Sequence, residues 1–145
     1  MKVEDPYDLQ RFVIAQSHCY EQVCIELGEG NKQSHWMWFI FPQLRGLGQS
    51  PMSKLYSISS QQEAEAYLLH PVLGSRLKHC TKLVMSIEGR SVQEIFGSPD
   101  DMKFRSSMTL FMRTSQENGI FKDALQKYFA GEPDQLTIDR LQMQK

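Results

Sequence analysis

Repeated helix-start signals, separated by apolar stripes of helical period, constrain this fold more than any other feature of the sequence. Asp5-Pro6 offers an N-cap followed by proline at the first helical position, and Ser98-Pro99-Asp100 repeats that pattern. Ser91 and Glu94 have the spacing of a capping box, as do two residues near position 60. Almost no segment alternates with the two-residue period of a strand. The sequence therefore predicts an all-α fold.

The apolar residues between these signals predict one compact domain. On the first predicted helix the stripe consists of Leu9, Phe12, Val13, Tyr20, Val23, Cys24 and Leu27. The helix after Pro99 is apolar on two sides, so we expect neighbours on both faces. A chain of 145 residues fits one domain. We predict a single compact bundle of about six to eight helices over the whole chain, with its core from about residue 5 to residue 141.

Three polar residues allow predictions about local structure. Ser34 should cap a short second helix that Pro42 ends. Asn118 should cap the helix that follows it. Gln16 lies within the apolar stripe of the first helix, where a buried amide must be hydrogen-bonded. It therefore either ties a loop down or faces a cavity, and we expect the tie.

Composition excludes several classes of function. The formal net charge of -1 lacks the basic excess typical of proteins that bind duplex DNA or RNA. Cys19, Cys24 and Cys80 form no CxxC pair, so we expect free thiols. No two histidines have metal-ligand spacing, and we expect neither a metal nor a cofactor. The acidic N-terminus does not look like a signal peptide, and the apolar run 36–41 is too short to span a bilayer. We therefore expect a cytoplasmic protein without membrane contact.

An aromatic run at residues 35–39 is the first candidate for a functional site. Trp36 and Trp38 fall on different faces of a short helix. Each indole could pack in the core and donate its N–H to a carbonyl, or one could stack on a base or another planar ligand. His35 lies beside them and is either a satisfied structural group or a catalyst.

The glycine-containing segment 43–57 reads as an irregular loop and is the second candidate. Arg45, Gly46 and Gly48 could bring backbone N–H groups and a guanidinium together around an anion. The same residues could also form no more than a tight turn. The pattern matches neither a Walker P-loop nor a dinucleotide-binding fingerprint.

The helix from Asp100 is the third candidate. Asp101 and Arg105 are four residues apart and share a face, while Lys103 lies on another. On an exposed face, Asp101 and Arg105 would form a weak surface pair. On a helix buried on two sides, the same charges are expensive to desolvate and are better candidates for a site. Asp100 and Asp101 could equally complement the helix dipole.

Four stretches of the sequence carry a resemblance to a known family. They are 34–48 (SHWMWFIFPQLRGLG), 70–74 (HPVLG), 95–101 (IFGSPDD) and 105–111 (RSSMTLF). Through them the chain resembles the uncharacterised bacterial family of the domain of unknown function numbered 1810, from Asp5 to about Leu141. The resemblance implies a compact all-α domain and transfers no catalytic residue. Members are sometimes labelled calpastatin, a disordered calpain inhibitor, and the capped helices predicted here do not fit that label.

Two functions remain open at this stage. The first is a site for a small phosphorylated or nucleotide-like compound. In it Arg45 and Arg105 would hold the anion with Lys103, Gly46 and Gly48; Trp36 or Trp38 would stack; and Asp101 or His35 would move a proton. A basic, Met-rich helix followed by an amphipathic one is similar to the ADP-ribose-related N-glycosidases and suggests a hydrolytic reaction. The second is a non-enzymatic module that binds a protein partner. Whether the predicted residues converge on one concave pocket distinguishes the two.

Overall fold

The computed structural model describes residues 4–115 and 119–144, and its regular secondary structure in that part of the chain consists of helices apart from one isolated β-bridge between Leu44 and Ile58. Ten helices run in the order α1 (Gln10–Ser17), α2 (Tyr20–Gly28), α3 (Met37–Ile40), α4 (Pro51–Leu55), α5 (Gln61–Leu69), α6 (Leu73–Met85), α7 (Val92–Phe96), α8 (Asp100–Thr114), α9 (Gly119–Phe129) and α10 (Gln135–Met143) within these residues. The predicted all-α class is confirmed. The number of helices exceeds the predicted six to eight.

Two local features account for the additional helices. The first predicted helix is broken at His18 and Cys19, so that α1 contacts α3 while α2 contacts α6. Neither glycine nor proline marks this break in the sequence. The predicted loop 43–57 contains the short helix α4, which Ser50 caps by accepting a hydrogen bond from the N–H of Ser53. Pro51 stands at its first position, where a missing N–H costs nothing.

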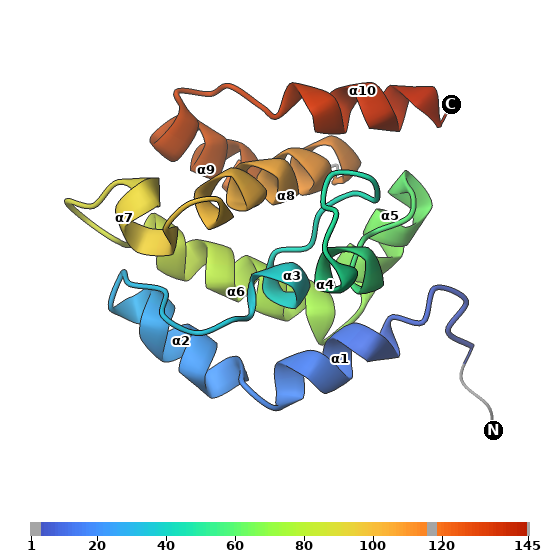
Figure 1. Cartoon of the computed structure of the whole chain (residues 1–145), viewed down its shortest axis with the longest axis horizontal. Helices are drawn as coiled ribbons and strands as arrows, with labels where there is room; N and C mark the ends of the chain where they lie inside the picture. Colours follow the sequence, from blue (N-terminus) through green and yellow to red (C-terminus); the bar gives the residue numbers. More distant parts are fainter. Residues whose placement is uncertain (1–3, 116–118, 145) are drawn as a thin grey trace.

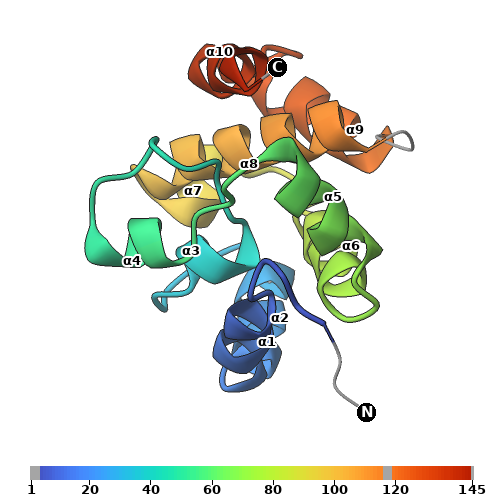
Figure 2. The same ribbon diagram turned by 90° about the vertical axis from the view of Figure 1, so that its right-hand side faces the viewer.

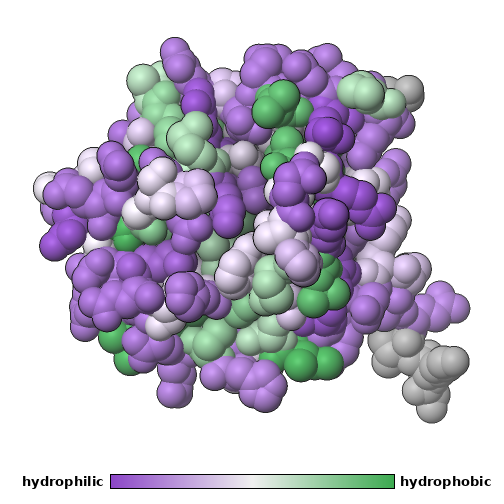
Figure 3. Space-filling model, in the orientation of Figure 1, coloured by the Kyte–Doolittle hydropathy of each residue, from purple (hydrophilic) through white to green (hydrophobic). Residues whose placement is uncertain are grey.

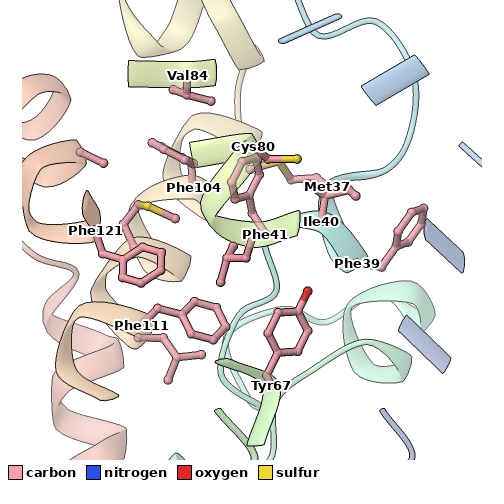
Figure 4. Packing of buried hydrophobic residues seen from close by; sticks show 14 of the residues in the cluster. Met37, Phe39, Ile40, Phe41, Tyr67, Cys80, Val84, Phe104, Phe111 and Phe121 are labelled. Atoms are coloured by element: carbon pink, nitrogen blue, oxygen red, sulfur yellow. The ribbon is translucent and has the colours of Figure 1, made fainter. Parts of the chain in front are cut away.

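Helix α8 lies at the centre of the molecule and is packed on several sides (Figure 1). It contacts α5, α7, α9 and α10, which confirms the prediction that this helix is buried on two faces. Its Phe104 ring lies 5.0 Å from the ring of Phe41 and 4.8 Å from that of Phe96. Figure 4 shows Phe111 on the same helix, close to the ring of Phe121. Buried apolar side chains from Leu9 to Leu141 form one continuous cluster around α8.

The predicted helix caps are present in part. Both halves of the Ser91–Glu94 capping box form. Asp5 accepts hydrogen bonds from the N–H groups of residues 9 and 10, so the first helix begins later than Pro6. Ser34 does not cap α3, because its hydroxyl and N–H both donate to another side chain. The predicted cap Asn118 lies outside the described residues.

The segment between α3 and α4 begins in the core with the buried Phe41 and Leu44 and then passes beside α4 (Figure 2). It is anchored where Arg45 N–H donates to the carbonyl of Ile58 and Ile58 N–H donates to that of Gln43, both at 2.8 Å. Hydrophilic residues cover most of the face shown in Figure 3, and the apolar residues there form small groups. None of the helices within the described residues has the length and apolar character needed to cross a bilayer.

Candidate functional site

Trp36, the first indole of the aromatic run, belongs to the core. Its side chain is completely buried, and its Nε1–H donates to Oε1 of Glu26 at 2.9 Å. The ammonium of Lys32 lies 5.1 Å from the indole ring. Because neither face of its ring is exposed, Trp36 is a core residue and is not available to stack on a ligand.

Glu26 is a buried carboxylate that the sequence-based predictions did not include. It is 2% exposed, and its two oxygens accept hydrogen bonds from the Ser34 N–H and hydroxyl, the Gln33 N–H, the Gln22 side chain and the Trp36 indole. Burial alone would raise the pKa of this carboxyl, but the hydrogen bonds, led by those from Ser34, lower it to about 2. Glu26 therefore stays ionised and fixes the segment before α3. Its position between Val23 and Leu27 on the apolar stripe was the signal that could have identified it.

The structure brings Trp38 and Lys103 together. The Lys103 ammonium lies 5.5 Å from the ring of the half-buried Trp38. Asp100 binds both Lys103, at 3.5 Å, and Lys32, at 2.9 Å. The buried Trp38 Nε1–H has no hydrogen-bond partner among the described residues. Because Asp100 lies between the two lysines and neutralises part of their charge, this cluster is a weak candidate for binding an anion.

The two residues predicted to move a proton are not brought together with these cations. His35 is exposed and forms no hydrogen bond or ion pair with a described residue. Oδ1 of Asp101 accepts a hydrogen bond from the N–H of Met102 at the start of α8. Neither side chain lines the two cavities described below.

Arg105 binds the segment between α9 and α10 instead of Asp101. Its Nε–H donates to the carbonyl of Glu132 at 3.0 Å, and its Nη2 lies 3.5 Å from the Glu132 carboxylate. The guanidinium also covers the ring of Phe129. Arg105 thus connects α8 to the chain that leads into α10, and it does not reach the loop that contains Arg45.

The predicted residues Arg45, Gly46 and Gly48 do meet, at a cavity of about 340 Å³. Its wall consists of the loop residues Arg45, Gly46, Gly48 and Gln49, and of Ser53, Lys54 and Ser57 on or next to α4. A cavity of this size is within the range of small-molecule sites. A second cavity of about 350 Å³ adjoins it and shares Arg45, Lys54 and Ser57. The two therefore form one cleft beside α4.

At two positions of this loop the backbone conformation or the packing requires glycine. Gly46 has a φ of +97°, which L side chains rarely adopt. At Gly48, an added Cβ would lie 2.5 Å from Cβ of Ser53, so α4 could not pack as it does. The turn alternative thus explains why glycine stands at both positions. It leaves the N–H groups of Gly46, Leu47 and Gly48 without an acceptor among the described residues.

Some of the cations around the cleft are paired with other groups and others are not. Arg11 is engaged: it binds Glu63 at 2.9 Å and donates to the carbonyls of residues 7, 8, 55 and 57. Arg45 and Lys54 are exposed and form no ion pair with a described residue. Arg140 on α10 reaches the same loop, because a Cβ on Gly46 would lie 2.6 Å from its Cζ. The sequence-based predictions missed Lys54 and Arg140, which no local pattern connects with Arg45.

No metal centre is visible in the part of the chain that the structure describes. No three His, Cys, Asp or Glu side chains there gather closely enough to hold an ion. The three cysteines are free thiols, as predicted.

Comparison with known proteins agrees with the resemblance predicted from the motifs. The family model described as "Protein of unknown function (DUF1810)" matches residues 6–141. The crystal structure of the conserved hypothetical protein Rv1873 from Mycobacterium tuberculosis is 55% identical in sequence, with a TM-score of 0.94. That match covers 94% of this chain and 98% of the other. No curated protein matches significantly. Neither description names a ligand or a reaction.

Proposed function

The chain belongs to the family of the Protein of unknown function (DUF1810), and for this member we propose that it binds a small phosphorylated or nucleotide-like compound in the cleft beside α4. One observation carries the proposal. Arg45 and Lys54 line the same cavity as Gly46 and Gly48, and no described carboxylate pairs with either cation. Unpaired cations beside free backbone N–H groups form a favourable environment for an anion.

Each group has a distinct part in the proposed site. The planar guanidinium of Arg45 suits two phosphoryl oxygens at once, whereas the Lys54 ammonium acts as a point charge. The N–H groups of residues 46–48 add donors that cost no side-chain entropy. Ser53 and Ser57 place hydroxyls in the wall, although both already take part in hydrogen bonds with neighbours.

The proposal is made for binding. Hydrolysis, as in an N-glycosidase, requires a group that can transfer a proton to or from the ligand. Neither His35 nor Asp101 lines the cleft, so neither is included in the proposed site. Their predicted roles in proton transfer stay predictions. Trp38, Lys103 and Arg105 likewise lie outside the walls of both cavities and are not included in the proposed site. The predicted residues as a set therefore do not converge on one pocket, and the proposal keeps only Arg45, Gly46 and Gly48 of them.

A thermal-shift measurement with AMP, ADP and a sugar phosphate tests the proposal. At a ligand concentration one hundred times its dissociation constant, the bound protein gains about 2.7 kcal/mol, which raises its Tm by several degrees. Arg45→Ala should remove this shift and leave the Tm of the free protein nearly unchanged, because Arg45 is exposed. Arg90→Ala, an exposed arginine near α7, is the matched control and should retain the shift.

Two results would contradict the proposal. If no phosphorylated compound shifts the Tm of the wild-type protein, the cleft is not such a site. If Arg45→Ala strongly lowers the Tm of the free protein, Arg45 is a structural residue.

The alternative function, a non-enzymatic protein-interaction module, is favoured by a different feature. Leu136 and Met143 are 63% and 81% exposed and lie two turns apart on one face of α10. Large apolar side chains exposed on one helix face are common at protein–protein contacts. The thermal-shift experiment discriminates, since a pure interaction module has no reason to respond to phosphorylated compounds.

A further inference from the structure

Arg140 reaches the loop of Gly46 without lining either cavity of the cleft. It lies on α10, near the end of the chain, whereas the loop it touches belongs to the first third. A Cβ built on Gly46 would be 2.6 Å from Cζ and 3.1 Å from Nη2 of Arg140. The guanidinium therefore lies directly against Gly46, and a side chain at this position would displace it.

No described side chain neutralises Arg140. It is exposed and takes part in no ion pair of the described residues. Of the carboxylates nearest to it in sequence, Asp134 caps α10 and Asp139 accepts a hydrogen bond from Gln135, and neither forms an ion pair with Arg140. Three cations, Arg45, Lys54 and Arg140, thus lie on or beside one loop and form no ion pair with the described part of the chain, although Asp8 lines the adjoining cavity together with Arg45 and Lys54.

An anion bound beside this loop is attracted by all three cations. Because exposed charges are screened by solvent, the gain comes from direct contact and grows with the charge of the ligand. A single phosphate ester carries a charge of about -1.5 to -2 at neutral pH. A diphosphate carries more charge and offers oxygens on two phosphorus atoms, so it can bind two separate groups of cations.

The positions of the cations fit two phosphoryl groups better than one. Arg45 and Lys54 line the cavity itself, and Arg140 approaches Gly46 from another helix without lining the cavity. The N–H groups of Gly46, Leu47 and Gly48 lie in the chain between Arg45 and α4 and are free of described acceptors.

We propose that the cleft recognises a diphosphate group, such as that of a nucleoside diphosphate, and that Arg140 of the C-terminal helix binds one of its two phosphoryl groups. This inference rests on the proposed function, because it assumes that the loop of Arg45 holds a phosphorylated ligand. It adds the class of ligand and a binding residue from the opposite end of the chain.

Isothermal titration of the full-length protein with pyrophosphate, phosphate, ADP and AMP tests the inference. The wild-type protein should bind pyrophosphate at least about tenfold more tightly than phosphate, and ADP more tightly than AMP in the same proportion, as one additional charged hydrogen bond provides. Arg140→Ala should weaken the binding of pyrophosphate and ADP about tenfold and change that of phosphate and AMP about twofold or less. Arg90→Ala should leave all four affinities as they are.

Arg140→Lys provides a second variant that keeps the charge and loses the planar fork. It should recover part of the lost ADP affinity, which a merely structural role of Arg140 would not predict. The Tm of both free variants should equal that of the wild type, because the side chain is exposed.

The outcomes separate the two proposals. Equal affinity of the wild type for pyrophosphate and phosphate, or an Arg140→Ala variant that binds ADP as the wild type does, overturns the diphosphate inference. If AMP binding still depends on Arg45 in that case, the proposed function stands. If none of the four compounds binds, both are wrong.

Discussion

At the scale of single residues, buried polar side chains on apolar helix faces hold the segments around the aromatic run. Gln16 is 1% exposed and donates to the carbonyl of Phe39 at 2.7 Å and to the Tyr67 hydroxyl at 3.1 Å. It therefore ties α3 to α1, as predicted. Glu26 does the same for the segment before α3, since four of the five hydrogen bonds to its carboxylate come from Gln33, Ser34 and Trp36. A charged residue at the edge of a stripe is more often solvated, which is why Glu26 was not predicted.

The pKa of Glu26 predicts how stability responds to acid. Its folded-state pKa of about 2 lies below the ordinary value of 4.5. The carboxylate therefore contributes stability above about pH 5, and this contribution is lost as the pH falls through 4.5 toward 2. We expect Glu26→Gln to lower the free energy of unfolding by about 3 kcal/mol at pH 7, and by progressively less below pH 4.5.

Urea unfolding at pH 7, 5 and 3.5 measures this difference. Glu29→Gln is the matched control, because Glu29 is exposed at the end of the same helix and should change the free energy by less than about 0.5 kcal/mol. A destabilisation by Glu26→Gln that is the same at all three pH values would show that the hydrogen bonds do not depend on the charge.

At the scale of elements, local signals predicted the presence of the helices better than the residues at which they begin and end. Capping residues and apolar stripes predicted about six to eight helices, and these segments are present in the described residues, the first of them divided into α1 and α2. The break between α1 and α2 has no local signal, because it arises from the different partners of the two halves, α3 and α6. Helix α4 had a signal, Ser50-Pro51, but its five residues are too few to form a periodic stripe.

The capping box of α7 allows a test at this scale. Ser91→Ala removes the acceptor of the Glu94 N–H and should cost about 0.5 to 2 kcal/mol of stability. The midpoint of urea unfolding should fall while the slope stays constant, since the change in exposed surface is unaffected. Ser75→Ala, on an exposed position of α6, should be nearly neutral; an equal effect of both variants would argue against a specific capping contribution.

At the scale of the whole molecule, one core surrounds α8 and determines which groups solvent can reach. Cys80, on α6, belongs to that core and is completely buried. Burial, assisted by the charge of Cys24, raises the pKa of its thiol to about 12. Cys24, by contrast, is only partly buried.

Alkylation therefore reports on opening of the whole core. With iodoacetamide at pH 8, we expect Cys80 to react at least about a hundredfold more slowly than Cys24, because the reactive thiolate is both rare and inaccessible. In urea above the unfolding transition the two rates should become similar. Mass spectrometry of the peptides measures both, and rapid modification of Cys80 in the native protein would contradict a closed core at this position.

The sequence by itself determined the helical class and the residues that pair within a few positions of each other. Capping boxes, apolar periodicity and the neighbours Arg45, Gly46 and Gly48 are local, and local geometry follows from φ, ψ and side-chain type alone. Only the tertiary structure decided which distant groups meet. It placed Trp36 in the core, turned Arg105 toward Glu132, left His35 and Asp101 outside the cleft, and brought Arg140 onto Gly46. Contacts of this kind depend on how the helices pack around α8, and the spacing of residues along the chain carries no information about them.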